Sequence, residues 1–287
     1  MTIQENAYAK INISLDVTGR RPDGYHDMLM PMQTVSLCDE LSLTLEGTTV
    51  QAKTNFRYIP GDERNLAVRA AKAFLSEIGE EKQGVRIEIN KRIPVGAGLG
   101  GGSADAAAVL RALNRAYNGV LDRQTLIALA AKIGSDVAFC LVGGTMLATG
   151  RGETLLGLPP LPDCSIVIVK PSFSISTPEL FKKLDSSPVR MHPDTDGLID
   201  ALEQGDLQGV ARRLYNVFED VDDRRMRTVR QIKSGLLDAG ALGAVMTGTG
   251  SAVFGLFRDE QAAVRCREEM KAEYGFAFAA KTVDRLL

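Results

Sequence analysis

The feature that most restricts the fold is a glycine-rich segment that runs directly into an alanine-rich one. Residues 94–110 read PVGAGLGGGSADAAAVL, with glycines at 96, 98 and 100–102 and a run of alanines behind them. Glycine loses the most backbone freedom on folding, whereas alanine is the best helix former. The pattern is consistent with a loop whose backbone cradles a phosphate, and also with a tight turn that packs a strand against a helix.

Two well-known nucleotide-binding patterns fit this loop poorly. Residues 96–101 satisfy G-x-G-x-x-G, but a dinucleotide fold also needs a strand that ends in an acidic residue about 20 positions later. The chain continues instead as DRQTLIALAAKI, which is helical in pattern. A P-loop needs a lysine at the point where Gly102 and Ser103 stand. A dinucleotide-dependent oxidoreductase therefore rests on the weak glycine match alone.

Composition places the chain among ordinary globular proteins. Of its 287 residues, 45% are hydrophobic and 24% are charged, and 34 basic against 36 acidic side chains leave a net charge of −2. These values exclude collagen-like, coiled-coil and mostly disordered chains. They also exclude an overall positive field that would attract nucleic acid or an anionic membrane. An anionic ligand must therefore be held by local groups.

The cysteines and the N-terminus indicate the compartment. The four cysteines are widely separated and form no C-x-x-C pair, so we expect neither a disulfide framework nor a zinc site. The opening MTIQENAYAKINISL lacks the pattern of a signal peptide, and no run of about 18 apolar residues is present. We expect a soluble, cytoplasmic protein without a membrane or nucleic-acid partner.

Hydrophobic periodicity predicts strands interleaved with helices in both halves of the chain, which indicates α+β or α/β architecture. The predicted strands are 9–17, 34–45, 84–94, 143–150, 164–170, 244–257 and 276–283, with a polar loop at 19–28. The predicted helices are 65–78, 104–117, 123–133, 177–184, two or three within 195–239, and 259–274. The run GLPPLPD at 157–163 carries three prolines. We therefore predict an N-terminal domain of residues 1–157 and a C-terminal domain of residues 158–287.

A lysine and an aspartate are the first candidates for chemistry outside the loop. Lys10 lies within the predicted strand AYAKINISL, and Asp136 follows a helix end in GSDVAF. Lysines in strands are usually solvated, and an aspartate after a helix usually forms a cap or turn. Together, however, the two side chains can orient and deprotonate a hydroxyl group.

Three further segments combine aromatic or glycine residues with polar ones. Tyr25 and His26 share a loop, the segment TPELF at 177–181 adds Phe181, and TGTGSAVF at 247–254 is a second glycine-rich stretch. The ordinary interpretations are a packed surface ring, a helix anchored by its apolar face, and a bulge or hairpin.

Taken together, these motifs resemble those of the GHMP kinase superfamily, named for galactokinase, homoserine, mevalonate and phosphomevalonate kinases. The superfamily pattern P-x-G-x-G-L-G-[GS]-S-[SA] appears as PVGAGLGGGSA, with one glycine more. The A-K-x-N and G-x-R-x-D-G-Y-H elements of the opening, the tract ERNLAVRAA, the K-R-x-P-x-G lead, G-[SA]-D-V, S-x-x-T-P and T-G-[ST]-G follow in order. The resemblance covers nearly the whole chain.

The resemblance implies an α+β, two-domain GHMP kinase fold with the active site in the interdomain cleft and a ferredoxin-like α/β sandwich as the C-terminal domain. It implies transfer of the γ-phosphoryl group of ATP to the 2-hydroxyl of a cytidine diphosphate derivative of methylerythritol, in the non-mevalonate isoprenoid pathway. The alternatives are another metabolite kinase of the superfamily and a nucleotide-binding regulator without catalysis.

The resemblance also implies roles for individual residues in phosphoryl transfer, which depends mainly on positioning and charge neutralisation. Asp136 is expected to accept the proton of the substrate hydroxyl, and Lys10 to keep Asp136 ionised and stabilise the developing alkoxide. Ser103 is expected to meet a phosphate or Mg²⁺. The expected ATP contacts are Pro94, Val95, Gly96, Ala97, Gly98, Leu99, Gly100, Gly101, Gly102, Ser103 and Ala104, with Asn65, Leu66 and Lys91 near the adenosine.

For the second substrate, the resemblance implies that Asn12 contacts the methylerythritol part. Tyr25 and Phe181 are expected to sandwich the cytosine ring, and His26 to read its polar edge. The other expected substrate contacts are Thr177, Pro178, Gly248, Gly250 and Ser251. One residue departs from the superfamily pattern: Ala138 stands where proline is usual after G-[SA]-D-V. We expect this change to loosen the loop at Asp136 without removing a functional group.

Overall fold

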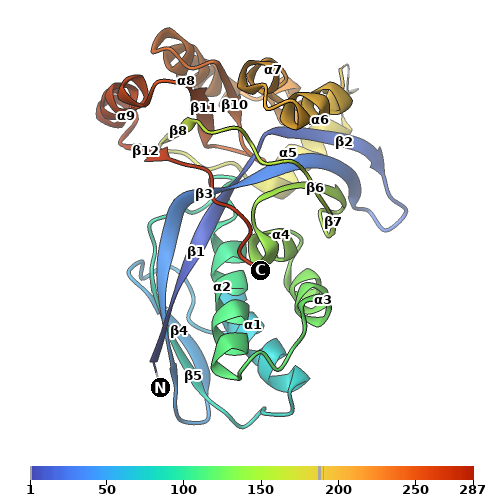
Figure 1. Cartoon of the computed structure of the whole chain (residues 1–287), viewed down its shortest axis with the longest axis vertical. Helices are drawn as coiled ribbons and strands as arrows, with labels where there is room; N and C mark the ends of the chain where they lie inside the picture. The colour runs from blue at the N-terminus through green and yellow to red at the C-terminus, as the bar shows by residue number, and fades with distance from the viewer. Residues whose placement is uncertain (1, 187–188, 190) are drawn as a thin grey trace.

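The fold is built on two β-sheets with helices packed against each of them (Figure 1). The structure is a computed structural model, and it describes residues 2–186, 189 and 191–287. None of the described helices is both long enough and apolar enough to cross a membrane.

The larger sheet is formed mainly by the first half of the chain, around the long strand β3. Its described strands are β1 (Thr2–Asn12), β2 (Ser14–Arg20), β3 (His26–Leu45), β4 (Val50–Thr54), β5 (Val85–Asn90), β6 (Thr145–Gly150), β7 (Thr154–Gly157) and β9 (Tyr215–Asn216). β4 with β5 and β2 with β9 are parallel pairs, whereas β3 runs antiparallel to β1, β2, β5 and β6. Because β3 spans 20 residues, it connects the lower and upper parts of the molecule.

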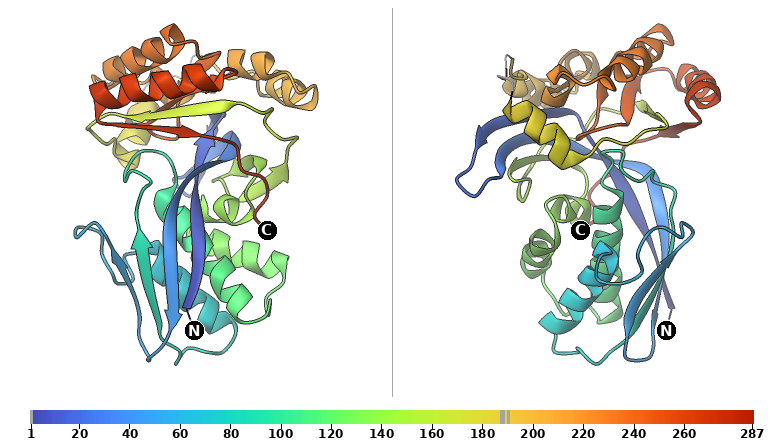
Figure 2. Two further views of the ribbon diagram at one scale, coloured as in Figure 1. Left: turned by 60° about the vertical axis from the view of Figure 1, so that its left-hand side comes forward. Right: turned by 180° about the vertical axis from the view of Figure 1, so that it is seen from behind.

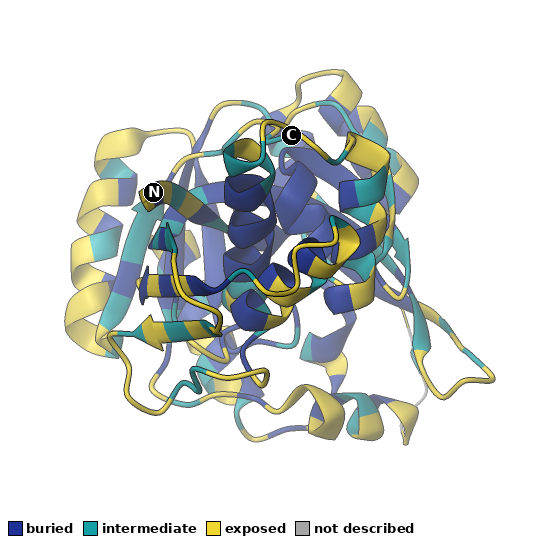
Figure 3. Cartoon of the chain, turned by 90° about the horizontal axis from the view of Figure 1, so that it is seen from below, coloured by how far each residue is buried: buried dark blue, intermediate teal, exposed yellow. Residues whose placement is uncertain are grey.

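Four helices cover one face of this sheet. They are α1 (Leu66–Glu77), α2 (Gly101–Ala116), α3 (Arg123–Ile133) and α4 (Val137–Val142). α2 packs directly on β1 and β3, with α1, α3 and α4 around it. Seen from below, the buried residues gather in the middle of this layer and the exposed ones lie at its rim (Figure 3). The alanines of α2 are fully or almost fully buried from Ala104 to Ala112, since their small side chains let the helix approach the sheet closely.

The smaller sheet consists of four antiparallel strands in the order β10-β11-β8-β12. These strands are β8 (Ser165–Lys170), β10 (Gly243–Met246), β11 (Val253–Phe257) and β12 (Phe276–Ala280). α8 (Met226–Asp238) and α9 (Glu260–Tyr274) lie on one face of the sheet (Figure 2). The strand–helix–strand–strand–helix–strand order is the one that a ferredoxin-like sandwich has. The division of the chain at residues 157 and 158 stays a prediction.

The connection from β8 to β10 contains shorter elements. These are α5 (Thr177–Asp185), α6 (Thr195–Glu203), α7 (Leu207–Arg212) and the 3₁₀ helix η1 (Val217–Asp220). The two sheets are also linked by the end of the chain. Residues 281–287 return to the larger sheet, where Thr282 bridges to Val35 and Arg285 bridges to Gly143.

Several predicted boundaries were wrong, each for a local reason. Half of the predicted loop 19–28 is strand, because Arg20 pairs with His26 and leaves a turn of only 21–25. The predicted strand 9–17 is interrupted at Ile13, between β1 and β2. The predicted strand 244–257 is a hairpin of β10 and β11, which agrees with the hairpin interpretation of the glycine-rich stretch 247–254. α4 was missed because all six of its residues are buried, so that it has no polar face and no amphipathic period.

Candidate active site

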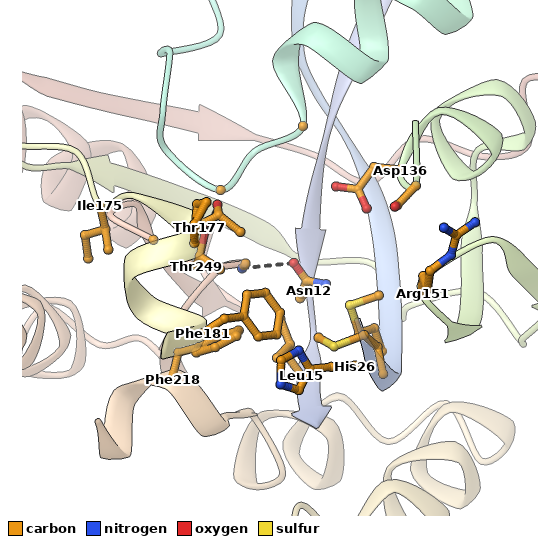
Figure 4. Close-up of a pocket in the computed structure, with 18 of the residues that line it drawn as sticks. Asn12, Leu15, His26, Asp136, Arg151, Ile175, Thr177, Phe181, Phe218 and Thr249 are labelled. Atoms are coloured by element: carbon orange, nitrogen blue, oxygen red, sulfur yellow. Dashed lines mark hydrogen bonds between the residues drawn. The ribbon is translucent and has the colours of Figure 1, made fainter. Parts of the chain in front are cut away.

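A cavity of about 780 Å³ opens between the larger sheet and the elements that follow β8. Figure 4 shows Asp136 and Arg151 on one side of it, Thr177 and Thr249 on the other, and Asn12 between them. Phe181, His26 and Leu15 lie toward one end. The size is typical of sites for ligands as large as a nucleotide. The lining residues that the sequence predicted are Lys10, Asn12, Tyr25, His26, Leu66, Gly96, Gly98, Gly100, Ser103, Asp136, Thr177, Pro178, Phe181, Gly248 and Gly250.

The glycine-rich loop lines the cavity with its backbone. Gly98 has φ +77°, a left-handed value that favours glycine, and a Cβ there would lie 2.1 Å from the carbonyl oxygen of Thr247. Gly248, with φ +56°, faces it from the second glycine-rich stretch, and its Cβ would lie 3.0 Å from the Gly98 oxygen. The two stretches therefore meet backbone to backbone, which no larger residue at position 98 permits.

The loop ends at the N-terminus of α2, whose first turn has no side-chain cap. Gly100 occupies the N-cap position in the left-handed conformation, and Ser103 in the first turn lines the cavity. The first backbone N–H groups of a helix lack partners within the helix, and the helix dipole is positive at this end. The 16-residue helix thus presents amide donors and partial positive charge to an anion in the cavity.

Lys10 and Asp136 lie next to each other in the wall of the cavity. The Lys10 Nζ lies 3.7 Å from Asp136 Oδ2 and donates a 2.7 Å hydrogen bond to Asn12 Oδ1. The Lys10 side chain is 5% exposed, whereas that of Asp136 is 30% exposed. Asp136 precedes α4 but makes no side-chain cap bond. A carboxylate that is reachable from the cavity, close to an ammonium group and without a capping role is suited to receive a proton from a bound hydroxyl.

Asn12 has its oxygen fully engaged and its amide nitrogen without a partner. Besides Lys10, the backbone N–H of Gly248 and the hydroxyl of Thr247 donate to Asn12 Oδ1, at 2.9 and 3.2 Å. These donors determine which way the amide points. Asn12 Nδ2 is buried and has no hydrogen-bond partner among the residues that the structure describes. Because buried donors are nearly always satisfied, this group is available to an acceptor on a ligand.

Aromatic side chains gather where the β2–β3 hairpin lies beside α5. The right-hand view of Figure 2 shows the ribbons of these two segments next to each other. The His26 ring stacks on Phe181 with centroids 4.6 Å apart, and Phe181 packs edge-on against Phe218 at 4.9 Å. His26 Nε2 lies 2.7 Å from Asp185 Oδ1. Tyr25 is 57% exposed and faces the Arg151 guanidinium at 5.2 Å. His26 thus lies on the face of Phe181, rather than at the edge of a slot between Phe181 and Tyr25.

Comparisons with known proteins agree with this arrangement. Residues 65–144 match the family model for the GHMP kinases N terminal domain, and residues 198–275 match the one for the GHMP kinases C terminal domain. The chain is 45% identical over 277 residues to a 4-diphosphocytidyl-2-C-methyl-D-erythritol kinase of Clostridium kluyveri, covering 96% of this chain and 99% of that protein. The chain belongs to the GHMP kinases. The predicted α+β fold of that family is confirmed.

Further relatives support the same GHMP kinase assignment. A kinase of the same name from Syntrophomonas wolfei is 44% identical over 272 residues, which are 95% of each chain. A crystal structure of 4-(cytidine 5′-diphospho)-2C-methyl-D-erythritol kinase superposes with a TM-score of 0.81 at 35% identity, covering 98% of this chain and 99% of that one. A homoserine kinase of Cytophaga hutchinsonii has a TM-score of 0.76 at 23% identity, which shows the shared fold.

Not every residue predicted to contact ATP in this GHMP kinase lies at the cavity. Asn65 caps α1, since its Oδ1 accepts from Ala67 N and its Nδ2 donates to the Pro60 oxygen, both at 3.0 Å. Ser251, predicted on the substrate side, is buried and donates to the Phe173 oxygen at 2.6 Å. The loop residues that do not line the cavity are Pro94, Val95, Ala97, Leu99, Gly101, Gly102 and Ala104.

Lys91 lies behind the glycine-rich loop, in a buried ionic cluster. Its Nζ is 2.5 Å from Asp39 Oδ2 and 2.6 Å from Asp105 Oδ2. Asp39 also accepts from the backbone N–H groups of Arg92 and Ile93. Burial alone would lower the pKa of Lys91, but Asp105 and Asp39 raise it, so the ammonium stays charged. Its amino group is thus engaged inside the protein and does not line the cavity, where an adenosine contact was expected.

Other lining residues were not foreseen from the sequence. Arg151, Asp185 and Thr249 line the cavity, together with Phe218 from η1. Arg151 stands in a turn after β6, in a context typical of solvated arginines, so nothing in its neighbours distinguishes it. In the described part of the chain, no three or more His, Cys, Asp or Glu side chains are grouped closely enough to hold a metal ion.

Proposed function

We propose that this chain phosphorylates the 2-hydroxyl of 4-diphosphocytidyl-2-C-methyl-D-erythritol with ATP, the reaction for which its relatives are named. One observation carries the proposal: Lys10 and Asp136 face an uncapped helix start in a cavity whose other end holds an aromatic cluster. The helix start suits a phosphoryl donor, and the aromatic cluster suits an acceptor that carries a nucleobase. The catalytic carboxylate lies between the two.

The proposed ATP-binding site consists of the backbone of the glycine-rich loop and the first turn of α2. When bound, ATP supplies the γ-phosphoryl group, and Mg²⁺ neutralises charge on its phosphates. The residues present fit such a group, because glycines at 96, 98 and 100 keep side chains out of the space along the loop. Leu66 offers an apolar contact beside it. The Ser103 hydroxyl would bind Mg²⁺, which takes few protein ligands when phosphate oxygens and water supply the others.

Asp136 acts as the base in the proposed reaction, and Lys10 is its electrostatic partner. The Lys10 ammonium lies 3.7 Å from Asp136 Oδ2, close enough to stabilise the alkoxide as the hydroxyl loses its proton to that carboxylate. Asn12 receives one hydrogen bond from Lys10 and presents its unpaired Nδ2 to the acceptor molecule. Most of the rate enhancement then comes from positioning and charge, as expected for phosphoryl transfer.

The aromatic end is proposed to hold the cytidine part. The Tyr25 ring, which Arg151 covers on one face, and the stacked pair of His26 and Phe181 offer aromatic surface to a base. Stacking on a base contributes about 1–3 kcal/mol per base in single-strand binders. His26 carries the polar atoms that can read a base edge. Thr177, Pro178, Gly248 and Gly250 lie between this end and the glycine-rich loop, where the diphosphate would pass.

A coupled assay of ADP release tests the proposal. The purified chain is given ATP and, in separate reactions, 4-diphosphocytidyl-2-C-methyl-D-erythritol, mevalonate, homoserine or galactose. We expect turnover with the cytidine compound and background rates with the other three. Turnover of one of the other three, without turnover of the cytidine compound, would refute the assignment and leave a GHMP kinase of different specificity.

A further inference from the structure

A buried asparagine, two residues before the cavity-lining Phe218, holds the second glycine-rich stretch in place. Asn216 lies in β9, is 2% exposed, and uses both hydrogens of its Nδ2. It donates to the Met246 oxygen at 2.7 Å and to the Gly248 oxygen at 2.8 Å. Its Oδ1 accepts from Phe218 N at 3.0 Å. With all three bonds made, the amide has a single orientation.

Glu219, three residues after Asn216, holds Met246, the residue directly before this stretch. Its Oε1 accepts from the backbone N–H of Met246 at 2.7 Å, and its other oxygen pairs with Lys233. The backbone N–H and carbonyl of Met246 are therefore both held by the segment 216–219. This segment in turn is attached to the larger sheet, because β9 pairs with β2 at Ser14 and Leu15.

The opposite side of the stretch reaches the proposed reaction centre. The Gly248 N–H and the Thr247 hydroxyl donate to Asn12 Oδ1, and the Thr247 hydroxyl also accepts from Asn12 N at 3.0 Å. Asn12 Oδ1 is the atom that receives the bond from Lys10 Nζ. A shift of residues 246–248 would therefore change the orientation of Asn12 and, through it, the position of the Lys10 ammonium.

We infer that Asn216 is a positioning residue for the proposed reaction: it fixes residues 246–248 so that they orient Asn12 and Lys10. This inference rests on the proposed function. Asparagine suits the role because one amide supplies two N–H donors to two carbonyls two residues apart. Aspartate in its ionised form would oppose both carbonyls with negative charge, and leucine would leave two buried carbonyls without donors.

The first test is a double-mutant cycle with Asn12→Ala and Asn216→Leu, measured as kcat and as KM for ATP. We expect Asn216→Leu alone to lower kcat by about tenfold or more, as small misplacements of reacting groups do. The KM for ATP should change less than kcat. Gly98 contacts the shifted residues, but the first turn of α2 is held by the packing of that helix on β1 and β3. In the Asn12→Ala background, the same substitution should cost little further activity, since both act through one group.

A matched control is available in α2. The side-chain amide of Asn114 also bonds to backbone: its Nδ2 donates to the Leu121 oxygen and its Oδ1 accepts from Leu121 N. Asn114 does not line the cavity. Asn114→Leu should lower thermal stability while leaving kcat near wild type. If Asn216→Leu does not fold, Asn216→Ser takes its place in the cycle, since serine keeps one donor for one of the two carbonyls.

A second measurement needs no substrate. Amide hydrogen exchange at residues 246–250 should be about tenfold faster in the Asn216 variant than in wild type, and unchanged in Asn114→Leu. Wild-type kcat in a folded Asn216 variant, equal effects of that variant with and without Asn12, or unaltered exchange would each overturn the inference. An inactive wild-type enzyme would instead count against the proposed function. The exchange experiment would still test whether Asn216 holds residues 246–248 in place.

Discussion

Two lysines, Lys10 and Lys91, stand near the same glycine-rich loop in very different surroundings. Lys10 lies at the cavity with one carboxylate 3.7 Å away, that of Asp136, which is 30% exposed. Lys91 lies behind the loop with two carboxylates, at 2.5 and 2.6 Å, both almost fully buried. Both lysines are themselves buried, so burial alone does not separate them.

The difference shows which lysine has charge to offer a ligand. The Lys91 ammonium is hydrogen-bonded to Asp39 of β3 and Asp105 of α2. Its charge therefore holds α2 and the start of the loop to β3 and is not available to a ligand. Lys10 has a looser ionic contact and a hydrogen bond to a neutral amide, so a developing negative charge nearby gains from it. The comparison predicts that changes at Lys10 and Asp136 affect rate, whereas changes in the Lys91 cluster affect stability.

The largest effect is expected for Asp136→Asn. The amide has nearly the shape of the carboxylate but cannot accept the proton, so kcat should fall by about 10²–10⁴-fold, the usual contribution of a general base. Binding of an ATP analogue, measured by calorimetry, should be nearly unchanged because the glycine-rich loop is intact. Near wild-type turnover would remove Asp136 from the role of base.

Lys10→Met is the next strongest change and bears directly on the comparison. We expect kcat to fall by about 10²-fold or more, because the positive charge beside Asp136 and the alkoxide is lost. The free energy of unfolding should change by less than about 2 kcal/mol, since Asn12 Oδ1 keeps its other two donors and Asp136 is partly exposed. Urea unfolding and steady-state kinetics on one preparation measure both. A large loss of stability with unchanged kcat would reverse the assignment of the two lysines.

Lys91→Met should lower the free energy of unfolding rather than kcat. Removing the cation leaves buried Asp39 and Asp105 without their ammonium partner, and breaking a buried ion pair in this way costs about 3–5 kcal/mol. Arg111→Met is a suitable control, because Arg111 is also a buried cation on this layer, paired with Glu5 away from the cavity. Urea denaturation measures both variants. If Lys91→Met is as stable as wild type but loses ATP binding, the predicted adenosine contact is favoured instead.

The smallest effect concerns the pH dependence of stability. Burial first, and the charge of Asp39 second, raise the pKa of Asp105, against the opposing pull of Lys91. The unfolded chain releases this proton near pH 4, whereas the folded chain keeps it to higher pH. The folded state then binds more protons, so its stability falls as pH rises above 4. Asp105→Asn should lack this contribution. In chemical denaturation from pH 4 to 8, the wild type should therefore lose stability relative to the variant as the pH rises. A constant difference would contradict it.

Much of the fold was predictable because it rests on local rules. The amphipathic patterns of α1 and α3 and the alternation in β5 located these elements within a few residues. The start of α2 was misplaced by three residues, because a helix whose first turn is glycine has no propensity signal there. The fully buried α4 gave no period to detect.

By itself, the sequence determined the family, the order of the motifs and the loop at 94–104, since these depend on residue types at short spacing. Only the tertiary structure decided which charged groups are available. Lys10 and Lys91 both stand in predicted strands, and their carboxylate partners come from distant segments. Arg151 and Asn216 became visible for the same reason, since each acts on residues far away in the chain. A side chain's type is local, but its charge balance and its hydrogen bonds depend on what folding brings beside it.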